Sequence, residues 1–390
     1  MTTPEYDLMI VGGGMVGAAC AVAAAQSGFR LALLEQQRPA FSDIDWSAQV
    51  SALNHRSQRF LADLGVWSSL KRSTAYQHMR VWEDTRCNEI HFQASDIPAS
   101  DLGHIVENAC LVDALWQTLI QSDQVDIITG KQVAALTCTD QGSQLNCADQ
   151  TVLSASLIIG ADGAQSTLRT LARIGLEQRD YAQDALVTLV RSTTPQQPAT
   201  AWQRFLPHGP LALLPLGTQH YAVVWSQTPE QAAALQTQPD AEFIRTLNQA
   251  SQGCCGLLEL AGERYRFPLR SQTALNYVQP GLALIGDAAH VIHPLAGQGV
   301  NLGLADAQVL INTLITARSR DESLGRFAIL RRYERARQGH NRITQFGMDA
   351  FHQLFTHPHP GVKHLRHAGL GLVSRSLLLR RTFERVASGL

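Results

Sequence analysis

The feature that most constrains this chain is a glycine-rich run with the spacing G-x-G-x-x-G, Gly12-Gly13-Gly14-Met15-Val16-Gly17. It directly follows an apolar stretch, Tyr6 to Val11, that is typical of a strand. It also opens an alanine-rich stretch, Met15 to Ser27, that is typical of a helix. Glycines in this context permit a tight turn and the close approach of a phosphate to the backbone. The sequence therefore predicts a nucleotide-binding βαβ unit at its beginning.

We expect the turn and the start of the helix to hold a pyrophosphate, because free N–H groups and the positive helix end favour an anion. The residues expected to make these contacts are Gly12, Gly14, Met15, Val16 and Gly17. Glu35 ends the second expected strand, Arg30 to Leu34, and its carboxylate can accept hydrogen bonds from both hydroxyls of a ribose. The alternative is a glycine-rich turn in another kind of α/β protein.

Length and composition limit the class of protein. A chain of 390 residues, 45% hydrophobic and 17% charged, can build two domains with sizeable cores. The net charge of −1 disfavours nucleic acid as a partner, since such binding needs an excess of Lys and Arg. Seven cysteines without a CxxC pair favour a reduced, cytoplasmic protein. No signal sequence or membrane-spanning stretch is evident, so we expect it to be soluble or peripherally associated with a membrane.

A later acidic motif indicates which dinucleotide is bound. Gly286-Asp287 follows an apolar run, Leu282 to Ile285, and precedes a helical pattern from Val300 to Ala317. A carboxylate at the end of such a strand is well placed to bind the ribityl chain of FAD, whereas NAD has no ribityl. The alternative role for Asp287 is that of a helix N-cap. The sequence therefore predicts FAD as the cofactor.

The loop that leads into this helix is expected to line the flavin ring. Pro294 and Leu295 would form an apolar wall beside the ring, and Gly297 would let the ring approach. Backbone N–H groups at the start of the helix would stabilise the negative charge of reduced flavin near N1 and O2. These N–H groups belong to Gly299, Val300 and Asn301. No acid or base residue is assigned in this loop.

A third motif, Gly160-Ala161-Asp162-Gly163, follows the apolar run from Ala155 to Ile159 and precedes a helical pattern through Leu168, Leu171 and Ile174. Between this motif and Gly286 the spacing of the apolar residues becomes the period typical of strands. These expected strands are Trp202–Phe205, Leu211–Pro215, His220–Ser226 and two within 77–94. The pattern predicts an α/β fold: a discontinuous Rossmann-like FAD-binding domain, an antiparallel-sheet substrate domain and a C-terminal helical region. The predicted FAD-binding domain comprises 1–75, 101–178 and 271–330. The predicted substrate domain comprises 76–100 and 179–270, and the helical region comprises 331–390.

These motifs, taken in order, carry a resemblance to a known family. Gly12–Gly17, Ala161–Gly163 and Gly286-Asp287 resemble the three signatures of class A flavoprotein monooxygenases of the p-hydroxybenzoate hydroxylase fold, over nearly the whole chain. Within that class, the run from Gly286 to Gly303 resembles the ubiquinone-biosynthesis hydroxylases, above all those that act late, on the demethoxy-ubiquinone ring. Further segments with the same resemblance are 64–67, 106–108, 277–281 and 387–390.

The resemblance implies FAD contacts at positions that match the family. Glu35 would bind the adenosine ribose, the Val133 backbone would lie near adenine, and Asp287 would bind the ribityl chain. Asp162 would lie near the pyrophosphate and the path of NAD(P)H. One position departs from the family, because Gln49 stands where an Arg is usual; an amide can still donate a hydrogen bond to FAD.

The resemblance also implies an activity. NAD(P)H would reduce FAD, O2 would add to give a flavin hydroperoxide, and one oxygen would pass to the phenolic ring of a polyprenylated aromatic molecule. One dinucleotide fingerprint is present, which favours transient docking of NAD(P)H on the FAD domain. Two alternatives are a flavin reductase or dehydrogenase of the same fold, and a catalytically silent flavin-bound factor in a ubiquinone-biosynthesis protein complex. The basic, amphipathic segment 361–390 could contact a membrane or a protein partner, or be an ordinary solvated helix.

Several other residues allow two interpretations. His290 and His293 could act as a general base, or could be hydrogen-bonded structural residues. Cys254-Cys255 could be redox-active, but reduced cysteines without a charged neighbour are usually inert. Aromatic side chains of the expected sheet could line a substrate pocket or simply form its core. These aromatic residues are Trp202, Phe205, Trp225, Tyr265 and Phe267.

Overall fold

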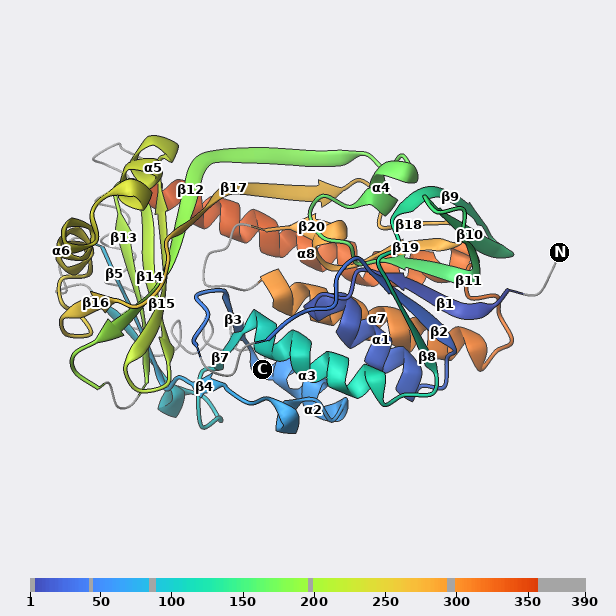
Figure 1. Cartoon of the computed structure of the whole chain (residues 1–390), viewed down its shortest axis with the longest axis horizontal. Coiled ribbons are helices and arrows are strands. Elements are labelled where there is room, and N and C mark those ends of the chain that lie inside the picture. Colours follow the sequence, from blue (N-terminus) through green and yellow to red (C-terminus); the bar gives the residue numbers. More distant parts are fainter. Residues whose placement is uncertain (1–3, 42–44, 84–88, 196–198, 293–298, 357–390) are drawn as a thin grey trace.

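The computed structural model describes residues 4–41, 45–83, 89–195, 199–292 and 299–356. It is a mixed α/β fold, as predicted, with two large sheets at opposite ends and helices packed between and around them (Figure 1). The helices are α1 (Met15–Gln26), α2 (His55–Asp63), α3 (Asn108–Ile120), α4 (Thr167–Leu171), α5 (Pro229–Thr237), α6 (Asp240–Ser251), α7 (Gly299–Arg318) and α8 (Phe327–Thr356). Short 3-10 turns are η1 (Trp67–Ser69), η3 (Ala94–Asp96) and η4 (Gly286–Ala288).

An eight-stranded sheet follows from the three predicted nucleotide-binding segments. Its strands are β1 (Tyr6–Val11), β2 (Leu31–Glu35), β8 (Val125–Thr129), β9 (Val133–Thr139), β10 (Gly142–Cys147), β11 (Val152–Gly160), β18 (Val278–Gln279) and β19 (Leu282–Leu284). The order is β18-β19-β11-β1-β2-β8, and β10 and β9 branch from β11. The run from β19 to β8 is parallel. Strands β19, β1 and β2 are mostly buried and read as continuous apolar stretches, as does the end of β11, whereas β8 lies at the edge and is partly exposed.

The glycine turn after β1 is as tight as its spacing predicts. Gly12 has a φ of +104°, which L side chains rarely adopt, and a Cβ there would lie 2.3 Å from the Ala161 carbonyl oxygen. A Cβ on Gly17 would lie 1.9 Å from the Gly12 carbonyl oxygen, so α1 can pack on the turn only through a glycine. A Cβ on Gly14 would meet nothing within 4 Å, which leaves open space above the first turn of α1.

The second large sheet has nine strands. They are β5 (His78–Trp82), β6 (Ile90–Gln93), β12 (Leu176–Ser192), β13 (Thr200–Leu206), β14 (Gly209–Leu216), β15 (His220–Gln227), β16 (Leu258–Leu260), β17 (Tyr265–Ala274) and β20 (His290–Val291). The predicted strands within 77–94 join it, as expected. It is antiparallel except where β5 pairs with β13 in parallel, because these strands come from distant chain segments and share no hairpin. A small third sheet contains β3 (Val50–Leu53), β7 (His104–Glu107) and β4 (Thr74–Ala75).

Two long strands join the two ends of the molecule. Strand β12 and its partner β17 run side by side along the top of Figure 1, and they continue past the predicted boundaries at 178 and 270. Their pairing shifts between Asp180 and Asp184, where Ala182 has a φ of +52°. The division into domains stays a prediction.

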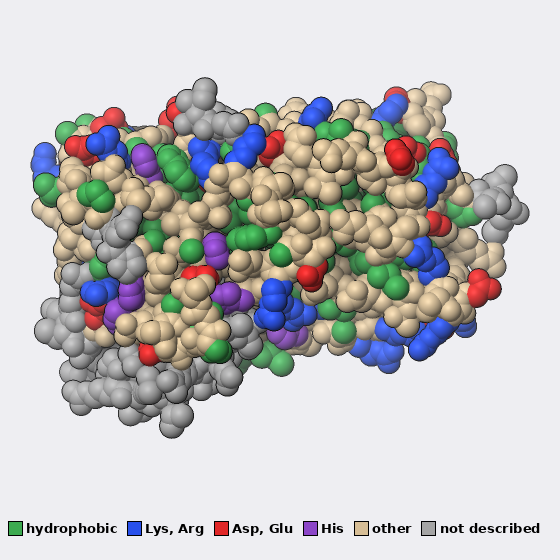
Figure 2. Space-filling model, turned by 90° about the horizontal axis from the view of Figure 1, so that it is seen from below, with side chains coloured by type: hydrophobic (Ala, Val, Ile, Leu, Met, Phe, Trp, Pro, Cys, Tyr) green, Lys and Arg blue, Asp and Glu red, His purple; other side chains and the backbone are tan. Residues whose placement is uncertain are grey.

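Two helical expectations need comment. The helix expected through Ile174 ends at Leu171, because Arg173 has a φ of +54° and turns the chain away. Among the described residues, α7 is the one helix long and apolar enough to cross a membrane, but it is mostly buried, between α1 and α8. On the face seen in Figure 2, basic and acidic side chains are mixed with hydrophobic ones.

We expect Gly17→Ala to lower the free energy of unfolding of the apoprotein by about 3 kcal/mol, because its methyl group would overlap the Gly12 carbonyl oxygen. Gly14→Ala is the matched control, with an expected cost below about 1 kcal/mol. Urea unfolding followed by circular dichroism measures both. Equal stability of the two variants would contradict the close contact.

Candidate functional site

The three predicted motifs meet at one edge of the parallel sheet. Val11 pairs with Gly160 and with Leu34, and Gly160 pairs with Leu284, so β1, β2, β11 and β19 end at the same level. Gly12, Glu35, Ala161-Asp162 and Gly286-Asp287 therefore follow one another along the carboxyl edge. In open α/β sheets this edge is where ligands bind.

Glu35 lies beside the glycine turn. Its Oε2 accepts a hydrogen bond of 2.6 Å from the Gly13 N–H, and its Oε1 accepts one of 2.7 Å from the Gln36 N–H. Trp116 stabilises the turn, because its indole Nε1 donates a hydrogen bond of 2.8 Å to the Gly13 carbonyl oxygen. Trp116 was missed, since nothing in the sequence of α3 relates it to the turn. The carboxylate keeps lone pairs that can accept ribose hydroxyls.

Val133 begins β9 close to this end of the site. Strand β8 ends at Thr129, opposite Glu35, and the Gly130 N–H donates to the Glu35 carbonyl oxygen at 3.1 Å. Three residues later the chain enters β9 at Val133. Three residues therefore separate the Val133 backbone from the hydrogen bond between Gly130 and Glu35, and its contact with adenine stays a prediction.

Asp162 organises its own loop. Its Oδ1 accepts a hydrogen bond of 2.5 Å from the Ser166 hydroxyl, and its Oδ2 accepts one of 3.0 Å from the Leu168 N–H at the start of α4. Arg169, which sequence reasoning missed, is buried and connects this loop to the next motif. Its guanidinium donates to the carbonyl oxygens of Ala164 at 2.7 Å and Ala288 at 2.9 Å.

Asp287 is exposed although its neighbours Gly286 and Ala288 are buried. Desolvation by the surrounding protein raises the pKa of the Asp287 carboxyl, and the charge of the nearby His290 opposes that shift. Gly286 has a φ of +58°, and a Cβ there would meet the Val16 side chain at 3.2 Å. The glycine turn and the Asp287 turn thus touch through Val16, and the carboxylate of Asp287 is open to a ligand.

The start of α7 is fixed by Asn301. We expected only its backbone to act, but its side chain is buried and its Nδ2 donates to the Ala52 carbonyl oxygen at 2.8 Å. Its Oδ1 accepts from the Asn54 N–H at 3.1 Å. Val300 is buried, and a Cβ on Gly299 would meet nothing within 4 Å. Pro294, Leu295, Gly297 and His293 lie outside the described residues.

Gln49 is exposed, between two anchored neighbours. Its N–H donates to the Ser47 hydroxyl at 3.1 Å, and the Ser47 N–H donates to Oε1 of buried Glu107 at 2.6 Å. Arg72 pairs with Glu107 at 2.8 Å and lies over the Trp46 ring. Burial raises the pKa of Glu107. The hydrogen bond from the Ser47 N–H and the charge of Arg72 lower it, but they offset only part of the effect of burial. This cluster holds the segment that presents Gln49.

The residues present fit an FAD molecule. A dinucleotide needs a tight turn and backbone free of Cβ atoms; Gly12 permits the turn, and Gly14 leaves open space where a Cβ would stand. It also needs acceptors for its hydroxyl groups, and the carboxylates of Glu35 and Asp287 stand at the same sheet edge. A helix start without crowding completes the cradle at Gly299.

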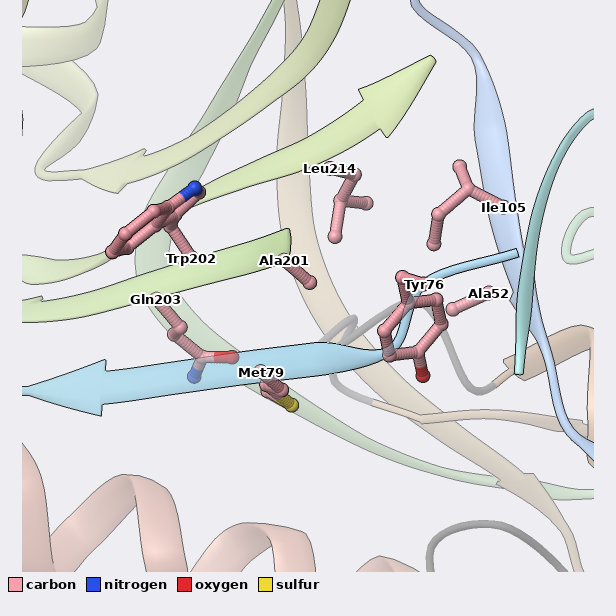
Figure 3. A pocket seen from close by; sticks show the side chains of 8 residues that line it. All are labelled: Ala52, Tyr76, Met79, Ile105, Ala201, Trp202, Gln203 and Leu214. Atoms are coloured by element: carbon pink, nitrogen blue, oxygen red, sulfur yellow. The ribbon is translucent and has the colours of Figure 1, made fainter. Parts of the chain in front are cut away.

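A narrow pocket lies between the nine-stranded sheet and the three-stranded sheet (Figure 3). Its cavity volume is about 20 Å³, room for about one water molecule. The lining is mostly apolar, with one amide and one phenol among the side chains. The lining residues are Ala52, Tyr76, Met79, Ile105, Ala201, Trp202, Gln203 and Leu214. Ala52 is the residue whose carbonyl oxygen binds Asn301, so the pocket wall touches the start of α7.

A titratable cluster stands behind this pocket. Tyr76 is bonded through its backbone to Leu102 and Gly103, and Asp101 pairs with His55 at 3.0 Å. Burial and the charge of Asp101 raise the pKa of Tyr76 to about 12, so this phenol stays protonated at neutral pH. Sequence reasoning missed the cluster because its members come from separate segments.

The structure bears on most of the residues that allowed two interpretations. Trp202 lines the pocket, and Phe205 and Trp225 are buried core residues. Tyr265 and Phe267 are exposed, so for them the core interpretation was wrong, and neither lines the pocket described above. His290 is buried and lies 2.5 Å from the Asp306 carboxylate, which favours the structural interpretation. Cys254 and Cys255 are buried free cysteines whose sulfur atoms lie 3.9 Å apart.

Comparisons with known proteins agree with this geometry. The sequence pattern of the FAD binding domain family matches residues 5–343. A 3-demethoxyubiquinol 3-hydroxylase from Escherichia coli is 37% identical over 396 residues, covering 100% of each chain. A mitochondrial ubiquinone biosynthesis monooxygenase from Drosophila melanogaster is 33% identical, covering 100% of this chain and 91% of its own.

The fold itself recurs in a solved structure. A p-nitrophenol 4-monooxygenase from Pseudomonas putida superposes with a TM-score of 0.79 at 18% identity, over 98% of this chain and 97% of its own. That likeness concerns the fold alone, whereas the sequence matches above extend along the whole chain. The chain therefore belongs to the FAD binding domain family and, within it, to the ubiquinone hydroxylases, and it is an FAD-dependent aromatic-ring monooxygenase.

Proposed function

We propose that this enzyme hydroxylates the ring of a polyprenylated phenol or benzoquinol in ubiquinone biosynthesis, with FAD, NAD(P)H and O2. The observation that carries the proposal is the 2.8 Å hydrogen bond from Asn301 to Ala52, which joins the helix start of the cofactor site to the wall of the pocket. The names of two relatives, a 3-demethoxyubiquinol 3-hydroxylase and a ubiquinone biosynthesis monooxygenase, support this substrate class.

Bound FAD would supply the redox chemistry, taking electrons from NAD(P)H and activating O2. The residues that would hold it are those at the carboxyl edge. We propose that Gly12, Gly14, Met15, Val16 and Gly17 bind the pyrophosphate, with Asp162 beside them, and that Val133 and Gln49 contribute at the periphery. Glu35 would bind the adenosine ribose, and Gly286-Asp287 the ribityl chain. The N–H groups of 299–301 would face negative charge on the ring.

The pocket would orient the substrate ring and keep water out. Its apolar walls, seen in Figure 3, suit an aromatic ring, and the Gln203 amide and the Tyr76 hydroxyl can bind ring oxygens. A volume of about 20 Å³ is too small for that ring, so side chains such as Met79 must move on binding. Excluding water matters because it protects the activated oxygen from side reactions.

Two other functions remain as alternatives of different classes. A flavin reductase or dehydrogenase of this fold would consume NAD(P)H without oxygen uptake, and a silent flavin-bound factor would consume neither. Substrate-dependent oxygen uptake separates both from the monooxygenase. We further propose that the protein is cytoplasmic, soluble or peripherally bound to a membrane, where 361–390, outside the described residues, would contact lipid or a ubiquinone-biosynthesis complex.

The first test is turnover with NADPH, a short-chain demethoxyubiquinol and isotopically labelled O2. We expect mass spectrometry to find one labelled oxygen atom in each product molecule, because the inserted atom comes from O2 and not from water. The control is the same reaction in labelled water with ordinary O2. Product without label from O2 would overturn the proposed function.

The second test is Asp287→Ala. We expect the dissociation constant for FAD to rise at least about tenfold, because a hydrogen bond to a charged acceptor is lost. Titration of the apoprotein with FAD, followed by flavin fluorescence, measures it. Asp123→Ala, an exposed carboxylate in the turn after α3, is the control. Unchanged affinity in Asp287→Ala would remove Asp287 from the cofactor site.

The third test is Met79→Trp, which adds bulk to the narrow pocket. We expect KM for the quinol to rise about tenfold or more while FAD content stays unchanged, because the pocket lies apart from the glycine turn. Phe267→Trp, an exposed position in the same sheet, serves as the control. If steady-state kinetics gave the same KM for both variants, the pocket would not be the substrate site.

A further inference from the structure

A buried ionic cluster lies beneath the Asp287 turn. We call it the Asp306 cluster and define it as Asp306, His290, Arg337 and Asn341. All four side chains are buried, and Asp306 is 0% exposed in the middle of α7. Burial alone would raise the pKa of the Asp306 carboxyl, but His290 and Arg337 outweigh it and hold the pKa below its ordinary value. The carboxylate is therefore charged, and it needs partners.

One oxygen of this carboxylate holds both ends of the turn. Oδ2 of Asp306 accepts a hydrogen bond of 3.2 Å from the Gly286 N–H, and it lies 2.5 Å from Nε2 of His290. Asp287 stands between these two anchors and is the exposed member of the turn. The Gly286 backbone has a positive φ and the Val16 side chain lies against it, so its position is closely defined.

The other oxygen is held from α8. Oδ1 of Asp306 accepts a hydrogen bond of 2.7 Å from Nε of Arg337 and one of 3.2 Å from Nδ2 of Asn341. Arg337 also donates to Oδ1 of Asn341 at 2.7 Å and to the Leu302 carbonyl oxygen at 3.3 Å. The Tyr277 ring lies 5.8 Å from the His290 ring and covers the cluster. One carboxylate thus joins the turn, α7 and α8.

We propose that Asp306 is a positioning residue: its charge, balanced by Arg337, sets the turn that presents Asp287, and the affinity for FAD depends on it. Asp306 does not itself face the ligand, because it is fully buried while Asp287 is exposed. This inference rests on the proposed role of Asp287. It does not depend on which aromatic substrate the enzyme hydroxylates.

Asp306→Asn tests the charge with little change of shape, since an amide cannot accept at both positions. We expect the dissociation constant for FAD, measured on apoprotein without substrate or oxygen, to rise about tenfold or more. Glu334→Gln is the matched control. Glu334 is a similarly buried carboxylate of α8, but it accepts from the Tyr277 N–H at 2.8 Å and pairs with Arg331, whereas Asp306 binds Gly286 and His290 of the turn itself.

Both variants should lower the apoprotein Tm, whereas only Asp306→Asn should weaken FAD binding. Unchanged FAD affinity in Asp306→Asn would overturn the inference, as would equal weakening in Glu334→Gln. If Asp306→Asn does not fold, Arg337→Lys keeps the charge but loses the fixed fork of donors, and we expect a smaller rise of the dissociation constant. Wild-type affinity in that variant would also overturn it.

A double-mutant cycle shows whether Asp306 acts through Asp287. In the Asp287→Ala background, Asp306→Asn should cause little further loss of FAD affinity, because the turn then has nothing left to present. Independent, multiplying losses would mean that Asp306 acts elsewhere and would contradict the positioning role. Failure of the labelled-oxygen test would leave these affinities unchanged, so the two proposals fail separately.

Discussion

The structure depends on the close contact between the start of α1 and the turn after β1. Because Gly17 has no side chain, the helix can sit directly on the turn, with its first N–H groups at the carboxyl edge of the parallel sheet, and because Gly12 has none, Ala161 can approach the turn. The other residues of the proposed cofactor site lie along this same edge. The register of β1 with β2 and β11, and of β11 with β19, brings Glu35, Asp162 and Asp287 to it.

Helix α7 connects this edge with the rest of the molecule. At its first residues, Asn301 binds the segment that walls the pocket, and in its middle Asp306 binds the Asp287 turn. Gly303 lets Val16 of α1 approach between the two, since a Cβ there would lie 2.5 Å from the Val16 side chain. A single helix therefore relates the glycine turn, the Asp287 turn and the pocket to one another.

Sequence patterns predicted the parts of the fold that rest on local chemistry. The glycine spacing, the continuous apolar strands and the Gly286-Asp287 turn all act through neighbours in the chain, and β1, α1, β2, β19 and α7 follow them closely. The predicted cofactor contacts remain predictions. A lone carboxylate on a buried helix face, such as Asp306, is a readable signal that a partner exists.

What the sequence could not reveal are contacts between distant segments. Arg337 lies 31 residues beyond Asp306, and Arg169 reaches a carbonyl 119 residues away. The pocket draws on five separate segments, at 52, 76–79, 105, 201–203 and 214. Strand β5 pairs with β13 in parallel, although the sequence predicted an antiparallel sheet. Such pairings are set by tertiary packing, for which a single sequence carries no period or spacing.

The long strands β12 and β17 have a consequence for how the enzyme can open. They are hydrogen-bonded to each other from Leu176 with Ala274 to Val187 with Tyr265, and they span from the cofactor end to the far sheet. A hinge between the two ends would have to bend a two-stranded ribbon and strain its ladder. The paired strands therefore oppose a swing of one end of the molecule against the other. If the narrow pocket is the substrate site, as proposed, we expect the ring to enter it by movement of side chains and loops.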